Sequence, residues 1–168
     1  MTTVVWFKRD LRVQDHTRLA RAAALGDIIP LYVFGPEYWA EPDVSGRQFA
    51  FVRECGAYLG AARSARGVPL VVRTGRVTDV LGSLPAFDRL ISHEETGNAW
   101  TYARDRAVAA WCCANGVAWE ELAQSGVVRR LNGRDGWAKQ RNAFLRQPVA
   151  VAPKSRSGPP VASDPVPD

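Results

Sequence analysis

Short apolar segments alternate with longer helical patterns along most of this chain. The apolar segments span residues 3–7, 28–34, 70–74 and 89–93, and a fifth begins at Val117. Short runs rich in Val, Ile and aromatic residues are typical of strands that are buried on both faces of a sheet. Because a helical pattern separates each run from the next, the order predicts an α/β fold with a doubly wound, five-stranded parallel sheet.

The segments between these runs carry helix signals. Helices are expected over residues 17–25, 45–66, 77–83 and 99–115. Ser45 can cap the second helix through its hydroxyl group. Glycines that follow the first and last helices are typical stop signals. These helices supply the crossovers that a parallel sheet requires.

The end of the chain has a different character. Residues 148–168 hold six of the eleven prolines and no aromatic residue. Such a segment cannot bury enough apolar surface to offset the entropy lost on ordering. We therefore expect residues 1–146 to form one α/β domain and residues 147–168 to form a disordered Pro-rich linker or tail. An ending of this kind is expected of a truncated protein whose next domain is absent.

The composition is that of a folded domain, since 46% of the 168 residues are hydrophobic. No apolar run approaches the roughly 18 residues of a membrane helix, and the first run is too short for a signal peptide. A cytoplasmic protein is expected.

Cys55, Cys112 and Cys113 show no CxxC spacing, which predicts buried free thiols. The net charge is +5, but the arginines are scattered along the chain, so charge alone does not indicate a nucleic-acid-binding protein.

The two most charged loops follow the first and fourth expected strands. They are KRDLRVQDH at residues 8–16 and HEETGN at residues 93–98. Ligands of open α/β sheets bind beyond the carboxyl ends of the strands, where the strand order reverses. That reversal is expected between these two strands. The sequence thus predicts a binding site with cations from the first loop and polar groups from the second: His93, Glu94, Glu95 and Asn98.

Structural roles are the alternative for several of these residues. Arg9, Asp10 and Arg12 can form ion pairs that hold the first loop in place. Glu94 and Glu95 can instead favour a helix N-terminus, where the helix dipole stabilises carboxylates.

Recognisable catalytic and nucleotide-binding motifs are missing from the sequence. GxSxG, GxGxxG and GxxxxGK[ST] do not occur, which argues against a nucleophile elbow and the usual nucleotide sites. His16 and His93 lack metal-ligand spacing, so a zinc site is not expected. The tryptophans are expected in the core. A stand-alone catalyst is therefore not predicted.

The charged loops resemble those of a known family. WFKRDLRVQDHTRL at residues 6–19 is similar to the opening WFRxDLRxxDNxxL of the DNA photolyase/cryptochrome family, with departures at Lys8 and His16. SHEETGNAWTYARDRAV at residues 92–108 resembles the block that carries the family's RDxxV helix. The matching residues are Trp6, Phe7, Asp10, Leu11, Arg12, Asp15, Leu19, Arg104, Asp105 and Val108. The resemblance covers about residues 3–146, the family's N-terminal Rossmann-like α/β domain.

The resemblance implies a function shared between two domains. The α/β domain would hold an antenna chromophore such as a flavin, a deazaflavin or a folate. A helical domain, absent from this chain, would hold FAD, contact damaged DNA and perform the light-driven lyase reaction that repairs it. Membrane binding is not expected. Without the helical domain the chain is expected to be inactive in DNA repair.

The resemblance also implies roles for particular residues. Folate-binding members hold the pterin with an Asn-Glu pair shortly before the RD motif, and Trp100 and Thr101 stand there in this chain. This departure argues against a folate held in that way. A different antenna would use residues of the two loops and the second strand: Lys8, Arg9, Phe34, Glu94, Glu95 and Asn98. Structural roles are expected for the motif residues Asp10, Arg12, Asp15, Arg104 and Asp105.

Two other functions stay open on the sequence alone. One is a stand-alone chromophore-binding or blue-light-sensing module that acts through partner contact. The other is an adenine-nucleotide-binding α/β domain. The residues that would separate a photolyase from a cryptochrome belong to the helical domain.

Overall fold

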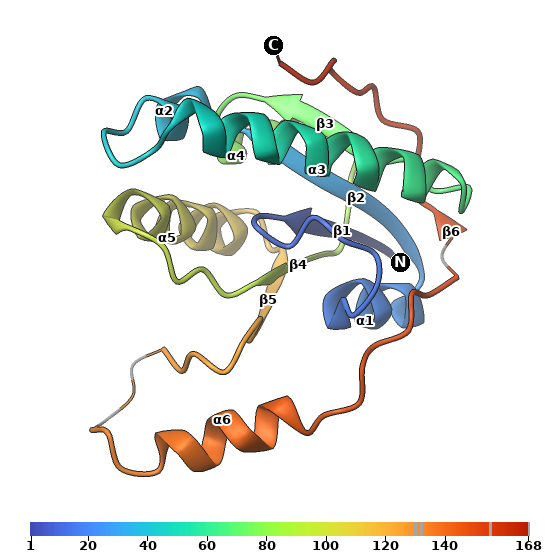
Figure 1. Cartoon of the computed structure of the whole chain (residues 1–168). Helices are drawn as coiled ribbons and strands as arrows, with labels where there is room; N and C mark the ends of the chain where they lie inside the picture. Colours follow the sequence, from blue (N-terminus) through green and yellow to red (C-terminus); the bar gives the residue numbers. More distant parts are fainter. Residues whose placement is uncertain (130, 132, 155, 168) are drawn as a thin grey trace.

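The computed structural model describes residues 1–129, 131, 133–154 and 156–167. Its centre is a parallel sheet with the strand order β3-β2-β1-β4-β5 (Figure 1). The predicted five-stranded doubly wound sheet is thus confirmed, with β1 central. The strands are β1 (Thr2–Phe7), β2 (Asp27–Phe34), β3 (Val71–Thr74), β4 (Arg89–His93) and β5 (Ala118–Leu122).

The four predicted helices are present. They are α1 (Thr17–Leu25), α3 (Gly46–Ser64), α4 (Val77–Ser83) and α5 (Ala99–Ala114). Ser45 caps α3 as expected: its hydroxyl accepts the backbone N–H of Gln48, whose side chain accepts the N–H of Ser45. This reciprocal capping box satisfies donors that the first turn of a helix leaves unpaired.

Two helices were not predicted, α2 (Pro36–Trp39) and α6 (Trp137–Leu145). The first is a single turn that starts at a proline, a residue favoured at that position. Neither helix contains a buried residue, so neither carries the apolar periodicity by which a core helix is recognised.

Each face of the sheet has its own core, because successive side chains of a strand point to opposite faces. On β1, Val5 and Phe7 pack with α1 and α3 through Leu19 and Leu59. The alternate residue Trp6 packs on the other face with residues of α4 and α5: Val77, Val80, Leu81, Val108 and Cys112. Both cores lie under the loops at the carboxyl edge and fix their positions.

The tail differs from the expectation of disorder, because its described part is extended along the sheet. The two-residue strand β6 (Arg156–Ser157) pairs with β2 beside Asp27. Further on, the Asp164 N–H donates to the carbonyl of Val72, and Thr74 donates its N–H to the Asp164 carboxylate. These contacts order the tail because the edge of β3 offers backbone groups that need partners.

All three cysteines are free, but only Cys112 is buried, which corrects the expectation of three buried thiols. Burial raises the pKa of the Cys112 thiol to about 11. Among the described helices, none is both long and apolar enough to pass through a lipid bilayer.

Candidate functional site

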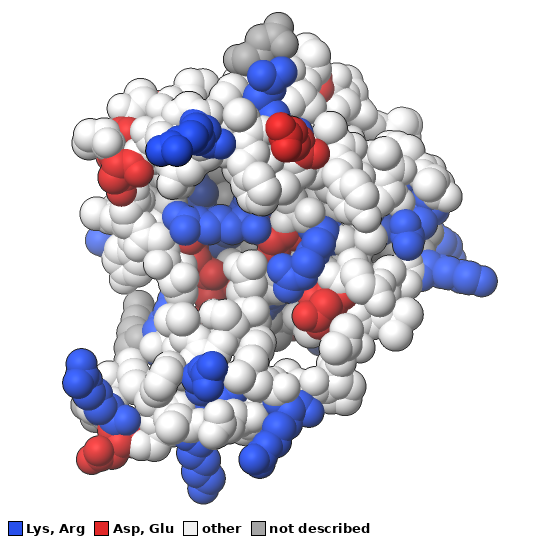
Figure 2. Space-filling view, in the orientation of Figure 1, with Lys and Arg blue, Asp and Glu red and all other residues white. Residues whose placement is uncertain are grey.

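A cavity of about 630 Å³ opens at the carboxyl edge of the sheet, where the strand order reverses between β1 and β4. It is lined by residues that follow β1 and β2 and by residues of α3 and α5. Figure 2 shows charged side chains of both signs where this face of the molecule is hollowed. The location agrees with the rule that α/β sheets bind ligands at such a switch point.

Aromatic side chains form much of the cavity wall. Tyr38 lies between Trp39 and Trp100, with ring centroids 5.1 and 5.3 Å apart. On the floor, the ammonium group of Lys8 lies 4.4 Å from the ring centroid of Trp6, and the Arg104 guanidinium lies 4.8 Å from it. Aromatic rings flanked by cations can hold a planar ligand that carries negative charge.

Charged residues beneath and beside the cavity alternate in sign. The Lys8 ammonium lies 2.7 Å from the Asp105 carboxylate, and Arg104 lies 2.8 Å from the same residue. Arg104 also contacts Glu95 at 3.2 Å. The ion pairs connect, in order, Arg9, Glu95, Arg104, Asp105, Lys8, Glu121 and Arg129. The network joins both charged loops to the loop after β5.

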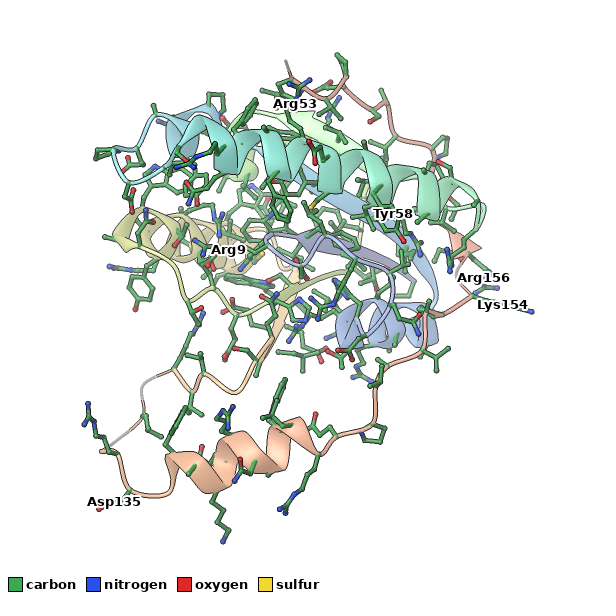
Figure 3. All side chains as sticks on the ribbon, in the orientation of Figure 1. Arg9, Arg53, Tyr58, Asp135, Lys154 and Arg156 are labelled. Atoms are coloured by element: carbon green, nitrogen blue, oxygen red, sulfur yellow. The ribbon has the colours of Figure 1, made fainter. Side chains whose placement is uncertain are left out.

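The cations of this network differ in what they can offer a ligand. Burial lowers the pKa of Lys8, although the neighbouring Asp105 carboxylate acts in the opposite direction. The Lys8 ammonium is therefore engaged mainly by carboxylates of the protein itself. The Arg9 side chain is 53% exposed and forms an ion pair with Glu95 at 3.3 Å. It lies beyond β1 on the side of α5 (Figure 3). Arg9 is thus the better placed of the two to contact a ligand.

Asp10 is buried under the first loop and is held by two histidines. One carboxylate oxygen lies 2.8 Å from His16 Nε2 and also contacts His93 Nδ1. The other oxygen accepts the backbone N–H of Lys8 at 2.8 Å. Burial opposes the ionised form, but the contacts with His16 and the backbone outweigh it and hold the pKa of Asp10 below its ordinary value.

The expected ion-pair role of Asp10 and Arg12 is corrected by this arrangement. The side chains that contact the Asp10 carboxylate are the imidazoles of His16 and His93 rather than arginines. Arg12 donates instead to the carbonyl of Asp15, at 2.9 and 3.2 Å. Asp15 has a φ of 50°, a left-handed conformation that aspartate tolerates better than most residues. These residues brace the loop as predicted, but through different contacts.

Asp10, His16 and His93 lie close enough together to suggest a metal site, but their hydrogen bonds do not fit one. His16 Nδ1 accepts the backbone N–H of Leu19 at 3.0 Å and so caps α1. A neutral imidazole with an acceptor at Nδ1 carries its proton on Nε2. That N–H faces Asp10, although it is not well aligned with the oxygen. Nε2 then has no lone pair for a metal. The two histidines instead surround and stabilise the Asp10 carboxylate.

This hydrogen bonding explains why histidine can stand where the family pattern has asparagine. Both side chains present one acceptor and one donor. We expect His16→Asn to retain the unfolding free energy within about 1 kcal/mol, whereas His16→Ala loses the cap and a buried donor and costs about 2 kcal/mol. Urea denaturation of the two variants is the measurement. Equal destabilisation by both substitutions would contradict the capping role.

The predicted ligand residues fall into two groups. Lys8, Arg9 and Glu95 line the cavity. The other three do not line it. Phe34 lies in the core beneath α3. Glu94 donates its N–H to Leu122 and borders a smaller hollow of about 270 Å³. Asn98 caps α5 and donates to Asp43.

The aromatic wall is the part of the site that sequence reasoning missed. Trp6 and Trp100 were expected in the core, and Tyr38 and Trp39 belong to the unpredicted α2. One usable signal was present, since Trp100 stands where the family resemblance places a ligand-binding residue. The alternation of side chains on β1 does not reveal that Trp6 also faces a cavity.

Comparisons with known proteins agree on one family. The family model described as DNA photolyase matches residues 3–132. Cryptochrome DASH of Natronomonas pharaonis is 40% identical over 89 residues, which are 49% of this chain and 19% of that protein. The chain thus spans about a fifth of the length of this curated relative.

Solved structures show the same fold. A class III photolyase from Agrobacterium tumefaciens superposes with a TM-score of 0.81 at 22% identity, covering 98% of this chain and 37% of that one. An archaeal photolyase from Sulfolobus tokodaii, solved with two FAD molecules and reported to imply a novel light-harvesting cofactor, has a TM-score of 0.71 at 21% identity over 94% of this chain and 37% of its own. With the matching family model, these findings show that the chain belongs to the photolyase/cryptochrome family and corresponds to its N-terminal α/β domain.

Proposed function

We propose that this domain binds an antenna chromophore in the cavity at the carboxyl edge of the sheet, which is lined by residues that follow β1, β2 and β3 and by residues of α3 and α5. The observation that carries the proposal is a cavity of about 630 Å³ with an aromatic wall and basic residues around it. A volume of this size is typical of sites for small organic ligands and cofactors. The Sulfolobus tokodaii photolyase with two FAD molecules supports a flavin among the possible chromophores.

A flavin fits the chemistry of the lining better than a neutral ligand does. Tyr38 and Trp100 offer apolar faces for a fused ring system. Arg9, Arg12 and Arg76 also line the cavity, and arginine is well suited to a phosphate or carboxylate. Arg76 is paired with Glu37 at 2.8 Å, whereas the pair of Arg9 with Glu95 is longer, at 3.3 Å. Arg9 is therefore the first candidate to contact an anionic group of the ligand.

The residues of this chain would bind and orient the chromophore and exclude water from one of its faces. A bound chromophore would supply absorption of near-ultraviolet or blue light. No residue of the cavity is assigned a proton-transfer or covalent step. The floor of paired charges under Trp6 would keep the site rigid, because each buried charge has a partner of opposite sign.

Repair of DNA would require a second, helical FAD-binding domain, which we propose as the functional partner, with damaged DNA contacted through that domain. A blue-light sensor of the cryptochrome type would use the same antenna domain. The 168-residue chain alone is therefore expected to show no light-dependent repair of pyrimidine dimers. Repair by the purified chain would contradict this division of labour.

Flavin binding is the direct test of the cavity. Adding FMN or FAD to the purified chain should quench tryptophan fluorescence with saturation. Trp100→Ala should weaken binding about tenfold, since stacking of a planar ring on an aromatic side chain contributes about 1–3 kcal/mol. Trp137→Ala is the matched control, because Trp137 lies on α6 outside the cavity.

Other ligands distinguish a flavin antenna from a different antenna and from an adenine-nucleotide-binding function. A deazaflavin or a folate, tested in the same way, would identify a different antenna. Saturable binding of ATP or AMP, with no uptake of any chromophore, would favour the adenine-nucleotide function and overturn the antenna proposal. Failure of every one of these ligands to raise the melting temperature at concentrations far above a plausible Kd would overturn both.

A further inference from the structure

Helix α3 carries an arginine on the side that faces the sheet. The helix crosses one face of the sheet (Figure 1), and its buried residues are Gly56, Leu59 and Arg63. Leu59 belongs to the apolar core on that face. Arg63 is wholly enclosed, with 0% of its surface exposed. Arginine is almost never fully buried unless a group of the protein pairs with it.

Arg63 nevertheless has no partner among the residues that the structure describes. None of its three guanidinium nitrogens has a hydrogen-bond acceptor there. Within the same residues, no ion pair is found for it. The acidic residue of α3, Glu54, is nine positions earlier and so lies on the opposite side of the helix. The helix therefore supplies no carboxylate on the side of Arg63.

The Arg63 guanidinium keeps its charge in spite of its burial. Burial and the neighbouring Arg66 lower its pKa to about 10, so the group stays protonated at neutral pH. A buried charge without a counter-charge is unfavourable in apolar surroundings. Since loss of a proton does not relieve this cost, an anion from outside the chain is the remaining way to neutralise the group.

A second buried arginine, Arg18, shows what internal compensation looks like. It is also 0% exposed, but its Nη2 donates to the carbonyl of Ala123 at 3.2 Å. Burial lowers its pKa to about 9, and four carboxylates act in the opposite direction, those of Asp10, Glu94, Glu121 and Glu120. The charged residue that acts on Arg63 is another cation, Arg66. Of these two arginines, Arg63 is the one that lacks a counter-charge in the described part of the chain.

The side of α3 that bears Arg63 also has unfilled space. Gly56 and Gly60 are seven and three positions before Arg63 and so share its side of the helix. A Cβ added to either glycine would meet no atom of the surrounding structure within 4 Å. Side chains of a helix lean toward its N-terminus, which directs the Arg63 side chain toward these glycines. The guanidinium and the space therefore lie on the same stretch of α3.

We propose that Arg63 binds a small inorganic anion, such as chloride or phosphate, between α3 and the sheet. The guanidinium offers N–H donors in a planar fork that suits an anion. Its complete burial selects for size, because a phosphate of a nucleic acid or a carboxylate of a protein partner cannot reach it. A small ion can enter during local opening of the structure. The exposed Arg66 would attract such an ion to this end of α3.

The test measures the melting temperature of the whole 168-residue chain while chloride or phosphate replaces gluconate at constant ionic strength. Gluconate is too large for an enclosed site. The wild-type melting temperature should rise along a saturable curve, by about 5–10 °C at an ion concentration about 100 times the Kd. Separate titrations show which of the two ions is preferred. A saturable response to neither ion would overturn the proposal.

Arg63→Met removes the buried charge and keeps an apolar stem of similar length. This variant should melt at or above the wild-type temperature in gluconate and should lose the saturable response to both ions. Arg47→Met is the matched control, because Arg47 lies on the same helix and is exposed. It should respond as the wild type does. Equal responses of the wild type and Arg63→Met would reflect a general salt effect and would overturn the proposal.

A second variant keeps the proposal testable whatever the stability of Arg63→Met. Arg63→Lys retains a positive charge but replaces the planar fork by a single ammonium group. The ion concentration at the midpoint of the saturable response should therefore increase about tenfold, the size typical of a lost charge-assisted hydrogen bond. Circular dichroism in gluconate checks that the variant is folded. An unchanged midpoint in folded Arg63→Lys would show that the ion binds elsewhere.

Discussion

Asp10→Ala is expected to lower the unfolding free energy by about 3–5 kcal/mol, the cost typical of removing one partner from a buried charged cluster. The substitution leaves two imidazoles and the backbone N–H of Lys8 without their common acceptor. Total stability of a domain is typically about 5–15 kcal/mol, so the loss is a large fraction of it. Chemical denaturation followed by circular dichroism is the measurement.

Acid conditions provide a second readout of the same cluster. The folded-state pKa of Asp10 lies below its ordinary value of 3.8. Its stabilising contribution is therefore complete above that value and is lost as the pH falls below it toward the folded-state pKa. Asp10→Asn, which keeps the shape but not the charge, should flatten the pH dependence of stability in this acidic window. An unchanged pH profile, with a small loss of stability, would show that Asp10 is not the buried anion described here.

Asp105→Asn should lower the unfolding free energy by about 3 kcal/mol, because among the described residues it leaves the buried Lys8 ammonium with one carboxylate partner, Glu121 at 3.4 Å. The double variant Lys8→Met with Asp105→Asn should recover most of that loss. Methionine retains the apolar stem over Trp6 and removes the charge that needs a partner. Melting temperatures and urea midpoints of the single and double variants form a double-mutant cycle.

The neighbouring Arg106→Ala is the control for this cycle, since Arg106 lies on the same helix and is exposed. It should change stability by less than about 0.5 kcal/mol. A double variant as unstable as Asp105→Asn would show that the cost arises from the helix or from Arg104 rather than from an unpaired Lys8.

The sheet could be predicted from the sequence because its signals are local. The strand at 89–93 and the helices at 17–25 and 77–83 have the predicted bounds. In each case a short apolar run or a capped helical pattern is enough to define the element. The position of the site followed from the same information, since the carboxyl ends of β1 and β4 are fixed once the strand order is known.

The partners of individual side chains could not be predicted in that way. Asp10 and His93 are 83 residues apart, and their contact depends on the pairing of β1 with β4. An arginine nearby in sequence was the simpler partner for Asp10, yet Arg12 turns to the Asp15 carbonyl. The role of His16 as both helix cap and donor depends on which imidazole nitrogen faces the backbone, a detail that a residue type does not contain.

Helix α6 shows a different limit of sequence reasoning. Its residues from Trp137 to Leu145 bury no side chain, so they give no periodic signal against a polar background. In the sequence, the four cations from Arg134 to Arg146 do not stand out from the basic residues that are scattered along the chain. Only the folded arrangement separates arginines that pair with carboxylates, such as Arg104, from residues such as Lys139, which has no ion pair among the residues that the structure describes.

The contacts of the tail with β3 also bear on how copies of this domain behave toward one another. A strand at the margin of a sheet exposes unpaired backbone groups, and a strand of another molecule can add there and begin aggregation. Residues Ser163 and Asp164 occupy this position on Val72 and Thr74. The domain thus protects this margin by occupation, which favours separate molecules over edge-to-edge polymers.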